Sequence, residues 1–407
     1  MICRHCRSRL TNVFLDLGRA PPSNAYLSEA ALSEPETAYP LRVFVCNDCR
    51  LVQTEDYADA GELFSPHYAY FSSTTKSWLD HAARFAGMIS ERLALSNESF
   101  VIEVASNDGY LLRNFLTAGI PCLGIEPTDS TAAAAEALGI PVLRKFFGEA
   151  LGRELAEGGR HADLVCGNNV FAHVPDINDF TRGLAAVLKP DGVVTLEFPH
   201  LLRLIDECQF DTVYHEHFSY LSLAVVERIF TGAGLRLFDV EELPTHGGSL
   251  RVYGCVTAAR HPTAPAVAEV LAMERRHGLD TDAPYAAFQS RADEVRDGLL
   301  SFLHEAKRTG KIVAGYGAAA KGNTLLNYAG VTQDLLPFVC DAAPSKQGLF
   351  MPGSHIPILP PSVLFERRPD FVLILPWNIA AEARSQLEPL AKTGTRFVTA
   401  VPSLRIF

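Results

Sequence analysis

The sequence lacks an apolar run that could cross a membrane, because a transmembrane helix needs about 20 consecutive apolar residues. The run FVLIL, which begins at Phe371, has only the length of a short strand. The opening stretch, MICRHCRSRL, also lacks the apolar segment of a signal peptide. We therefore expect no membrane partner and a cytoplasmic location.

An excess of positive charge is missing as well. The 36 Lys and Arg residues are outnumbered by 47 Asp and Glu residues, so the net charge is -11. Because nucleic-acid-binding domains usually carry a strong basic patch, we expect no nucleic-acid partner. A local basic pocket for a phosphate is still compatible with this balance. The length of 407 residues predicts two to three domains, at roughly 100–200 residues each.

Cysteine is sparse outside the N-terminal segment and paired within it. Of the nine cysteines, five are isolated, mostly in apolar runs, as small core residues are in a reducing compartment. The others form two CxxC pairs, whose four thiolates would complete the closed tetrahedral shell of a structural zinc ion. A redox role is the alternative, but neither pair opens a helix after a strand. The expected zinc ligands are Cys3, Cys6, Cys46 and Cys49.

The segment HYAYFSSTTKSWLDHAARF (67–85) follows the second pair and is rich in Tyr and Ser. Its second half is expected to be a helix. A packed linker and a tyrosine-rich flap that faces a neighbouring pocket explain the segment equally well.

From residue 100 onward, apolar strand-like segments alternate with helical ones, as in FVIEVASNDGYLLRNFL and PCLGIEPTDS. This alternation predicts a parallel, doubly wound α/β sheet, which binds ligands at the carboxyl ends of its strands. LRLFDVEELP and SLRVYGCVTA are expected to form a closing hairpin around HGGS (246–249). This region should cover an acceptor substrate, so His246 and Gly247 are candidate substrate contacts.

The turn after the first of these strands does not match GxGxxG and has too few glycines to cradle a pyrophosphate. It matches the acidic-x-Gly-x-x-x-Gly turn of S-adenosylmethionine (SAM)-dependent methyltransferases, with Ala105 in place of the first Gly. Glu126, at the end of the second strand, would accept hydrogen bonds from the two ribose hydroxyls. The Phe146–Phe147 pair could flank the adenine ring. Asn168 and Asn169, at the end of the fourth strand, would lie at the methionine end of SAM. A nucleotide-independent α/β domain and an NAD site with a degenerate turn are the alternatives. The predicted cofactor residues are Glu103, Ala105, Asn107, Gly109, Glu126, Phe146, Phe147, Asn168 and Asn169.

The segment DTVYHEHFSY (211–220) concentrates Tyr and His around an acid. It follows the predicted fifth strand (193–198) and a helical segment, on the ligand side of the sheet. A metal site lacks a third ligand at a recognisable spacing, and a polar surface stretch is the plainest alternative. We favour proton transfer by a histidine beside the ligand.

The C-terminal part begins with a long polar helix, expected at about 286–309 and interrupted near Gly298. In the segment GKIVAGYGAAAKGN, a strand is followed by a glycine turn and a helix with a lysine in its first turn. Backbone N–H groups, the helix dipole and the ammonium together predict an anion site. A Rossmann-like domain that serves only support or dimerisation is the alternative. The candidate ligand contacts here are Gly315, Gly317, Lys321, Asp341, Lys346 and His355.

In chain order, these motifs resemble the zinc-containing sugar C-methyltransferases, which act on nucleotide-linked 4-keto-deoxysugars. The resemblance is carried by CxxC…CxxC, HYAYFSS, EVASNDGYLL, GIEP, YHEHFSYLS, HGGSLR, GYGAAAKGN, PSKQGLFMPGSHIPI and PWN. It implies a zinc-binding domain (1–66), a SAM-dependent methyltransferase domain with an inserted active-site segment (67–260) and a second Rossmann-like domain that helps to bind the sugar nucleotide (261–407).

The resemblance also implies roles for individual residues. His217 matches the catalytic base, Tyr214 and Glu216 match its neighbours in the site, and Tyr68 matches an active-site tyrosine. The implied substrate is a nucleotide-linked keto sugar, with dTDP as the expected nucleotide, and the protein is expected to be a monomer or homodimer.

The expected reaction is methylation at C3, next to a C4 ketone that makes the C3 proton acidic. A neutral His217 would remove this proton, since the ordinary pKa of histidine is about 6.5. Zinc would take no part, because its shell is closed. An O- or N-methyltransferase on a sugar nucleotide is the nearest alternative. A noncatalytic scaffold and an NAD-dependent oxidoreductase are more distant ones.

Overall fold

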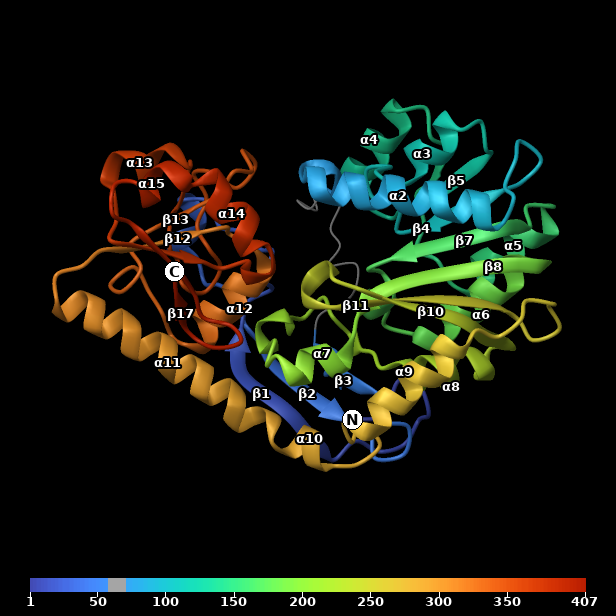
Figure 1. Ribbon diagram of the computed structural model, residues 1–407, viewed down its shortest axis with the longest axis horizontal. Helices are drawn as coiled ribbons and strands as arrows, with labels where there is room; N and C mark the ends of the chain where they lie inside the picture. The colour runs from blue at the N-terminus through green and yellow to red at the C-terminus, as the bar shows by residue number, and fades with distance from the viewer. Residues whose placement is uncertain (58–70) are drawn as a thin grey trace.

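The computed structural model describes residues 1–57 and 71–407. Within these ranges the strands form sheets of four, seven and six strands. Figure 1 shows the small N-terminal sheet below two larger α/β units, the middle one cyan to yellow and the C-terminal one orange to red. The predicted fold class, with a small N-terminal part and two Rossmann-like units, is confirmed. The limits of the three domains stay a prediction.

The N-terminal sheet is antiparallel, with the strand order β1-β2-β3-β9. A register shift between Val13 and Leu15 lets the consecutive residues Phe14 and Leu15 both reach the core. The last strand comes from the segment 211–220, so this sheet holds the end of the candidate catalytic segment in place. The strands are β1 (Asn12–Ala20), β2 (Tyr39–Val45), β3 (Val52–Thr54) and β9 (Ser219–Tyr220).

The middle sheet has the order β10-β11-β8-β7-β4-β5-β6, and β11 alone runs antiparallel to its neighbours. Apart from Glu103, the central strands β4 and β5 are apolar, and they are buried on both faces, as parallel sheets covered by helices require. The predicted hairpin is formed by β10 and β11. The strands are β4 (Val101–Val104), β5 (Cys122–Ile125), β6 (Val142–Leu143), β7 (Ala162–Asn168), β8 (Leu188–Pro199), β10 (Leu235–Leu243) and β11 (Ser249–Val256).

Helices cover both faces of the middle sheet (Figure 1). One layer consists of α2 (Lys76–Arg92), α3 (Leu112–Thr117) and α4 (Asp129–Ala137). The other consists of α5 (Glu149–Glu157), α6 (Ile177–Val187), α8 (Leu223–Gly232) and α9 (Pro265–Arg276). Although α9 lies beyond residue 260, Val267 and Val270 bury against the core of the middle sheet.

The C-terminal sheet has the order β14-β13-β12-β15-β16-β17 and is parallel except for the last pair. Its strands are β12 (Val313–Tyr316), β13 (Val339–Cys340), β14 (Ile358–Leu359), β15 (Phe371–Ile374), β16 (Arg396–Thr399) and β17 (Arg405–Ile406). Its helices are α12 (Ala320–Tyr328), α13 (Ser362–Arg367), α14 (Ala380–Gln386) and α15 (Glu388–Ala391).

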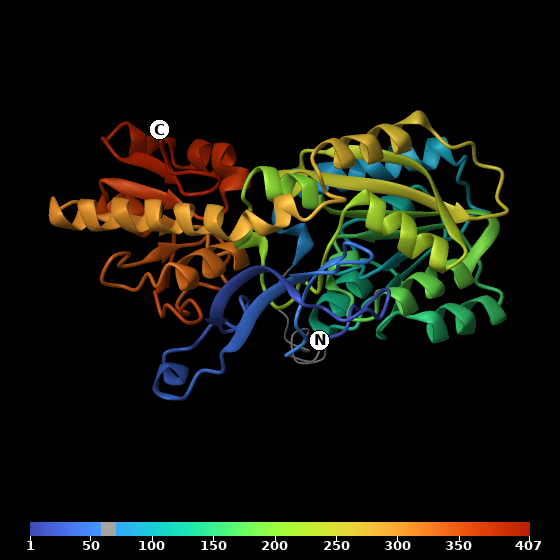
Figure 2. The same ribbon diagram turned by 90° about the horizontal axis from the view of Figure 1, so that it is seen from below.

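The long helix α11 (Phe288–Arg308) follows the short α10 (Ala283–Ala286) and ties the C-terminal sheet to the N-terminal one (Figure 2). Its Phe288 ring stacks on Phe14 of β1, with the ring centroids 4.5 Å apart. The predicted interruption near Gly298 is wrong, because α11 is continuous through this residue. A buried stripe at helical spacing outweighs the weak helix propensity of one glycine. The stripe is formed by Phe288, Ala292, Val295, Leu299, Leu303 and Ala306.

Shorter elements complete the fold. They are α7 (Leu201–Asp206) and the 3₁₀ helices η1 (Ala30–Ser33), η2 (Ser72–Thr74), η3 (Phe171–His173), η4 (Phe210–Thr212), η5 (Thr245–Gly247) and η6 (Trp377–Ile379). In the part of the chain that the structure describes, no helix combines the length and apolarity needed to cross a bilayer.

Candidate active site

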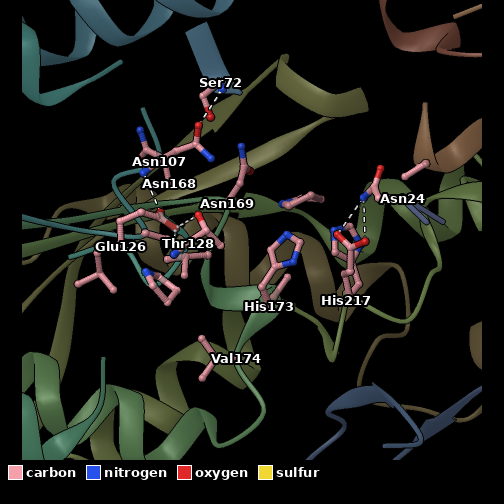
Figure 3. Close-up of a pocket in the computed structure, with 18 of the residues that line it drawn as sticks. Asn24, Ser72, Asn107, Glu126, Thr128, Asn168, Asn169, His173, Val174 and His217 are labelled. Carbon is pink, nitrogen blue, oxygen red and sulfur yellow. Dashed lines mark hydrogen bonds between the residues drawn. The ribbon is translucent and has the colours of Figure 1, made fainter. Parts of the chain in front are cut away.

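A cavity of about 620 Å³ lies between the middle and C-terminal units. Its walls come from the ends of β4, β5 and β7, from the turn 214–217 and from the start of α12. In Figure 3, Asn107, Glu126 and Asn168 lie on one side, while His173, His217 and Asn24 lie on the other. The cavity therefore joins the predicted cofactor turn to the predicted catalytic segment.

The turn after β4 has a left-handed backbone at three predicted residues. The φ angles are 56° at Ala105, 50° at Asn107 and 78° at Gly109. A Cβ atom on Gly109 would approach Ile140 Cδ1 to 2.5 Å, so this position needs glycine. Ala105 adopts the conformation that glycine favours, which explains why related turns carry Gly there. Ala105 and Asn107 line the cavity.

Glu126, which follows β5, lines the same cavity. Its Oε2 accepts the backbone N–H of Asn107 at 2.9 Å, and its Oε1 accepts that of Thr128 at 2.9 Å. A carboxylate offers about four acceptor positions, so capacity is left for a ligand hydroxyl. Recognition of a ribose by Glu126 stays a prediction that this geometry allows.

Asn168 ends β7, Asn169 follows it, and both line the cavity. The Asn168 side chain is only 7% exposed, and neither amide atom has a hydrogen-bond partner among residues 1–57 and 71–407. Leaving such a group unpaired costs about 1–3 kcal/mol, so a polar ligand is expected to satisfy it. The Asn169 amide donates to Nε2 of His246 at 3.0 Å and so fixes that ring at the edge of the cavity.

The other predicted cofactor residues divide into two groups. Phe146 and Phe147 line the cavity, and Phe147 also packs edge-on against Phe180, with centroids 5.5 Å apart. Glu103 is fully buried and does not line the cavity, and neither does Gly109. Burial, together with the Asp108 carboxylate, raises the pKa of Glu103 well above its ordinary value. Glu103 therefore lies beneath the turn, and its assignment as a cofactor contact stays a prediction.

His217 lines the cavity with a side chain that is 8% exposed. Its Nδ1–H donates to the Thr212 carbonyl at 2.8 Å, which leaves Nε2 as the atom with a free lone pair. Burial, followed by the neighbouring His173 ring, lowers the pKa of His217 well below its ordinary value. The ring is consequently neutral at pH 7. The Tyr214 ring lies 3.9 Å from it, centroid to centroid.

The N-terminal part contributes to this site through Asn24, which the sequence reasoning missed. Its Nδ2 donates to both carboxylate oxygens of Glu216, at 2.8 and 3.0 Å (Figure 3). The segment around Asn24 also contacts the C-terminal unit. The Ser23 backbone carbonyl accepts a hydrogen bond from the Asn323 side-chain amide, and the Tyr26 hydroxyl donates to the Ala318 carbonyl at 2.6 Å. A polar PSNAY stretch after a strand gives no local signal of such a role.

His173 was also missed, because it is a lone histidine in the apolar stretch NVFAHVP. It ends η3, and its ring lies edge-on to His217, with centroids 4.6 Å apart. Burial lowers the pKa of His173 to about 4, so this ring is neutral as well. Two neutral imidazoles therefore face the same space.

The C-terminal wall is built around Lys321, in the first turn of α12. Its Nζ donates to Asn378 Oδ1 at 2.8 Å and lies 4.7 Å from the centre of the Trp377 ring. The Trp377 indole N–H donates to Asp211 at 2.8 Å. Burial raises the pKa of Asp211 to about 6. Burial also lowers the pKa of Lys321, whereas the negative charge of Asp211 raises it and so partly offsets the effect of burial. Lys321 thus places a cation in the cavity wall.

Of the remaining predicted substrate contacts, only some line the cavity. Lys346 lines the cavity and donates to the Ala318 carbonyl at 2.7 Å. Asp341 follows β13 and accepts a hydrogen bond from the Ala318 N–H at 2.7 Å. It therefore holds the glycine turn (315–317) in place. His355 lies against Glu36, 2.9 Å away, and is not a wall residue. Gly247, Gly315 and Gly317 do not line the cavity, and Tyr68 lies outside the described residues.

Gly247 has a packing role instead. A Cβ atom at this position would come within 2.4 Å of Trp377 Cη2. The HGGS turn therefore lies directly on the indole that supports Lys321.

The four N-terminal cysteines meet in one cluster, with all four Sγ atoms within 4.8 Å of one another. The Cys3–Cys49 and Cys6–Cys46 sulfur pairs are 3.6 and 3.5 Å apart. Tetrahedral zinc with Zn–S bonds of about 2.3 Å places its sulfurs about 3.8 Å apart, so the cluster fits that ion. The Gln53 amide donates to the Cys3 sulfur at 3.2 Å, a contact that would favour a metal-bound thiolate.

The fold and the cavity define a SAM-dependent methyltransferase, and comparison with known proteins agrees. Consecutive parts of the chain match a zinc binding domain (3–64), a methyltransferase domain (77–240) and the C-methyltransferase C-terminal domain (244–402). The C-methyltransferase NovU of Streptomyces niveus is 35% identical over 404 residues, which are 99% of this chain and 96% of that protein. The chain belongs to the family of zinc-containing C-methyltransferases.

Two more distant similarities concern parts of the chain. The ubiquinone biosynthesis O-methyltransferase of Rhizobium etli is 28% identical over 98 residues, covering 23% of this chain and 38% of that protein. The structure of magnesium protoporphyrin IX methyltransferase from Synechocystis, with bound SAM, covers 44% of this chain and 82% of its own, at 14% identity and a TM-score of 0.33. The family resemblance drawn from the motifs is confirmed, as are SAM as cofactor and a zinc-binding N-terminal part.

Proposed function

We propose that this enzyme methylates C3 of a nucleotide-linked 4-keto-deoxysugar, and that the nucleotide is dTDP. The observation that carries the proposal is the buried, neutral His217, whose Nδ1 is occupied by the Thr212 carbonyl. Its remaining ring nitrogen is a base in a wall of the cavity that also contains the cofactor turn. The relative NovU, a C-methyltransferase by name, supports transfer to carbon.

Carbon needs activation before it can be methylated, and a ketone supplies this by making the neighbouring C–H bond acidic. His217 Nε2 takes the C3 proton, and the electron pair of that bond moves toward the C4 oxygen to give an enolate. General bases of this type typically contribute about 10²–10⁴-fold in rate. Bound SAM supplies the electrophilic methyl group.

The enolate oxygen needs a hydrogen-bond donor that is already in place, because fixed dipoles usually supply the largest share of the rate enhancement. The rings of Tyr214 and His173 both contact the His217 ring, and both residues line the same cavity. Tyr214 offers its uncharged hydroxyl as this donor, whereas the one N–H of the neutral His173 ring is directed to the Glu216 backbone carbonyl. Tyr68 remains an expected participant from the resemblance, outside the described residues.

The cofactor fits the opposite side of the cavity. Asn168 supplies an amide that has no partner within the described part of the chain, Glu126 retains acceptor capacity, and Phe146 and Phe147 provide apolar walls. Asn107 supplies a left-handed backbone that shapes the turn. These residues would hold a ligand that carries hydroxyl, amino and aromatic groups.

Exchange of the C3 proton tests the proposal directly. Without SAM, the wild-type enzyme should exchange C3–H of the keto sugar for deuterium in D₂O, followed by NMR. His217→Ala should reduce exchange and methyl transfer at least 10²-fold, while SAM affinity measured by calorimetry stays within about twofold. Methylation without any C3 exchange would favour an O- or N-methyltransferase instead, and near-full turnover by the variant would exclude His217 as the base.

A further inference from the structure

The first CxxC pair encloses a buried arginine. Arg4 lies between Cys3 and Cys6 and is only 6% exposed, although arginine is almost never this buried unless it is paired. Its backbone N–H donates to Gln53 Oε1 at 2.9 Å, and the Gln53 amide in turn donates to the Cys3 sulfur at 3.2 Å. The cysteine cluster and Gln53 therefore fix the backbone from which the Arg4 side chain extends.

The Arg4 guanidinium contacts two segments that are far apart in the chain. Its Nη1 donates to the Pro175 carbonyl at 3.0 Å, and Pro175 lies two residues after His173. Its Cζ lies over the Phe218 ring, 5.3 Å from the ring centre, and Phe218 directly follows His217. Arg4 therefore joins the loop that carries His173 to the segment that carries His217.

The other contacts of this guanidinium hold it against the N-terminal sheet. Its Nη2 donates to the Thr54 carbonyl at 2.9 Å and to Asp56 Oδ1 at 2.8 Å. Thr54 also donates its hydroxyl to the His217 carbonyl at 3.1 Å and its backbone N–H to the Phe218 carbonyl at 3.2 Å. Because a guanidinium presents its donors in a rigid planar fork, the directions of these bonds cannot change independently.

The relative position of the two segments decides how their imidazoles meet. The His173 and His217 rings lie edge-on, with centroids 4.6 Å apart (Figure 3), and the His173 ring is hydrogen-bonded to the Glu216 carbonyl. Reacting atoms have to come within about 3–3.5 Å of each other, and a displacement of about 1 Å can cost about 10²-fold in rate. A small shift between the segments would therefore be felt at His217.

Docking of the N-terminal part is the plainer interpretation of a buried arginine, but the same CxxC pair has other docking contacts. His5 Nδ1 pairs with Asn178 Oδ1 at 2.8 Å, and the Asn178 amide donates to the His5 carbonyl at 2.9 Å. These two contacts attach the pair to the start of α6. Arg4 differs from His5 because it contacts both the loop after His173 and the ring that follows His217.

We propose that Arg4 is a positioning residue for the methyl-transfer site, whose guanidinium holds the loop 173–175 against the segment 211–220 and so sets where His217 lies in the cavity. The inference rests on the proposed function, because it takes His217 to be the base. It also gives the cysteine cluster a specific role, which is to hold the backbone of Arg4. The zinc-binding part thus acts on the reaction through one side chain, without chemistry at the metal.

Arg4→Gln in full-length, zinc-loaded enzyme tests this role, because it removes the charge and the fork and keeps the backbone bond to Gln53. C3 deuterium exchange of the dTDP-linked 4-keto sugar and kcat for methyl transfer should both fall about 10–100-fold, since the base no longer stands in its place. Zinc content by mass spectrometry and SAM affinity by calorimetry should stay unchanged. Should this variant fold poorly, Arg4→Lys keeps the charge without the fork and is expected to lose about threefold or more in both rates.

Arg7→Gln is the matched control. Arg7 follows the same CxxC pair and reaches the same loop at Asp176, 3.9 Å away, but its side chain is 69% exposed. Because exposed ion pairs contribute little, this variant should leave the exchange rate, kcat, zinc content and SAM affinity unchanged.

A second measurement does not depend on the acceptor. In enzyme with isotope-labelled histidine, the ring signals of His173 and His217 in NMR spectra report on their surroundings, and His173→Asn and His217→Ala assign them. Arg4→Gln should shift both signals, whereas Arg7→Gln should shift neither.

The outcomes separate this inference from the function on which it rests. Unchanged C3 exchange or unmoved ring signals in folded Arg4→Gln and Arg4→Lys would overturn the inference. A loss of zinc or of SAM affinity that matches the loss of rate would also overturn it, because Arg4 would then serve folding alone. If the wild-type enzyme exchanges no C3 proton, the proposed function fails, and the ring signals still decide whether Arg4 positions the two histidines.

Discussion

At the scale of the residue, the proposed chemistry depends on histidines that burial keeps neutral. His217, His173 and His246 all have a lowered pKa, and in each case loss of water around the ring is the main cause. A neutral imidazole can accept a proton, whereas a protonated one cannot. If His217 is the base, burial should therefore keep it active into the acidic range.

This predicts the acidic side of the pH–rate profile. As pH falls through the pKa of His217, the base becomes protonated and kcat/KM falls. Since that pKa is well below 6.5, kcat/KM should not fall by half until the pH is well below 6.5. The measurement is kcat/KM for methyl transfer from pH 5 to 8. Asp211, with a raised pKa of about 6, also titrates within this pH range, so Asp211→Asn serves as the control. A His217-dependent midpoint at or above 6.5 would contradict the prediction.

Asn24 is predicted to act through Glu216, which is 2% exposed. Asn24→Ala removes two hydrogen bonds to a buried carboxylate, and bonds to charged groups contribute about 1.5–3 kcal/mol. We expect kcat to fall about 10–100-fold with SAM affinity unchanged. Glu216→Gln and the double variant complete a mutant cycle, in which the two losses should be strongly non-additive. Strictly additive losses would show that Asn24 acts elsewhere.

At the scale of the element, local pattern and observed structure agree where periodicity is strong. The βα alternation, the β10–β11 hairpin and the CxxC knuckles were predictable because each follows from short-range spacing. The continuous helix α11 was not, since Gly298 suggests a break and only packing over a long apolar stripe prevents it. Tertiary burial decides such cases.

Gly298 gives a test of that interpretation. Its φ is not in the left-handed region, and nothing lies within 4 Å of a Cβ atom placed there. Gly298→Ala should therefore stabilise the protein by about 0.5–1 kcal/mol, measured as the free energy of unfolding in urea. Leu299→Ala, next to it in the buried stripe, is the matched contrast and should cost about 2–5 kcal/mol. Destabilisation by Gly298→Ala would mean that the helix needs glycine flexibility at this point.

At the scale of the whole molecule, the zinc-binding part is joined to the chemistry. β9 adds the end of the proposed catalytic segment (211–220) to the N-terminal sheet, and Thr54 of that sheet donates to the His217 carbonyl at 3.1 Å. Ser23, Asn24 and Tyr26 reach both larger units. Disruption of the cysteine cluster should therefore disturb the active site, although the closed shell leaves zinc no chemical role.

Removal of zinc provides the corresponding prediction. Chelation, or Cys46→Ser, should lower the melting temperature and reduce methyl transfer more than tenfold, because structural zinc contributes directly to folding energy. Metal content by mass spectrometry, followed alongside activity, checks this. Cys208→Ser, a change at a buried cysteine outside the cluster, controls for loss of a thiol. Full activity in metal-free enzyme would contradict the coupling.

The sequence by itself determined the elements and the chemistry that short spacing encodes: the four cysteines, the SAM turn, the alternating strands and helices, and the histidine segment. These depend on neighbours within a few positions, so the chain alone reveals them. Only the tertiary structure decided that Asn24 meets Glu216, that His173 faces His217, and that Glu103 lies beneath the turn rather than in the cavity. The separation of 192 residues between Asn24 and Glu216 leaves no local pattern, because such contacts follow from how whole sheets pack.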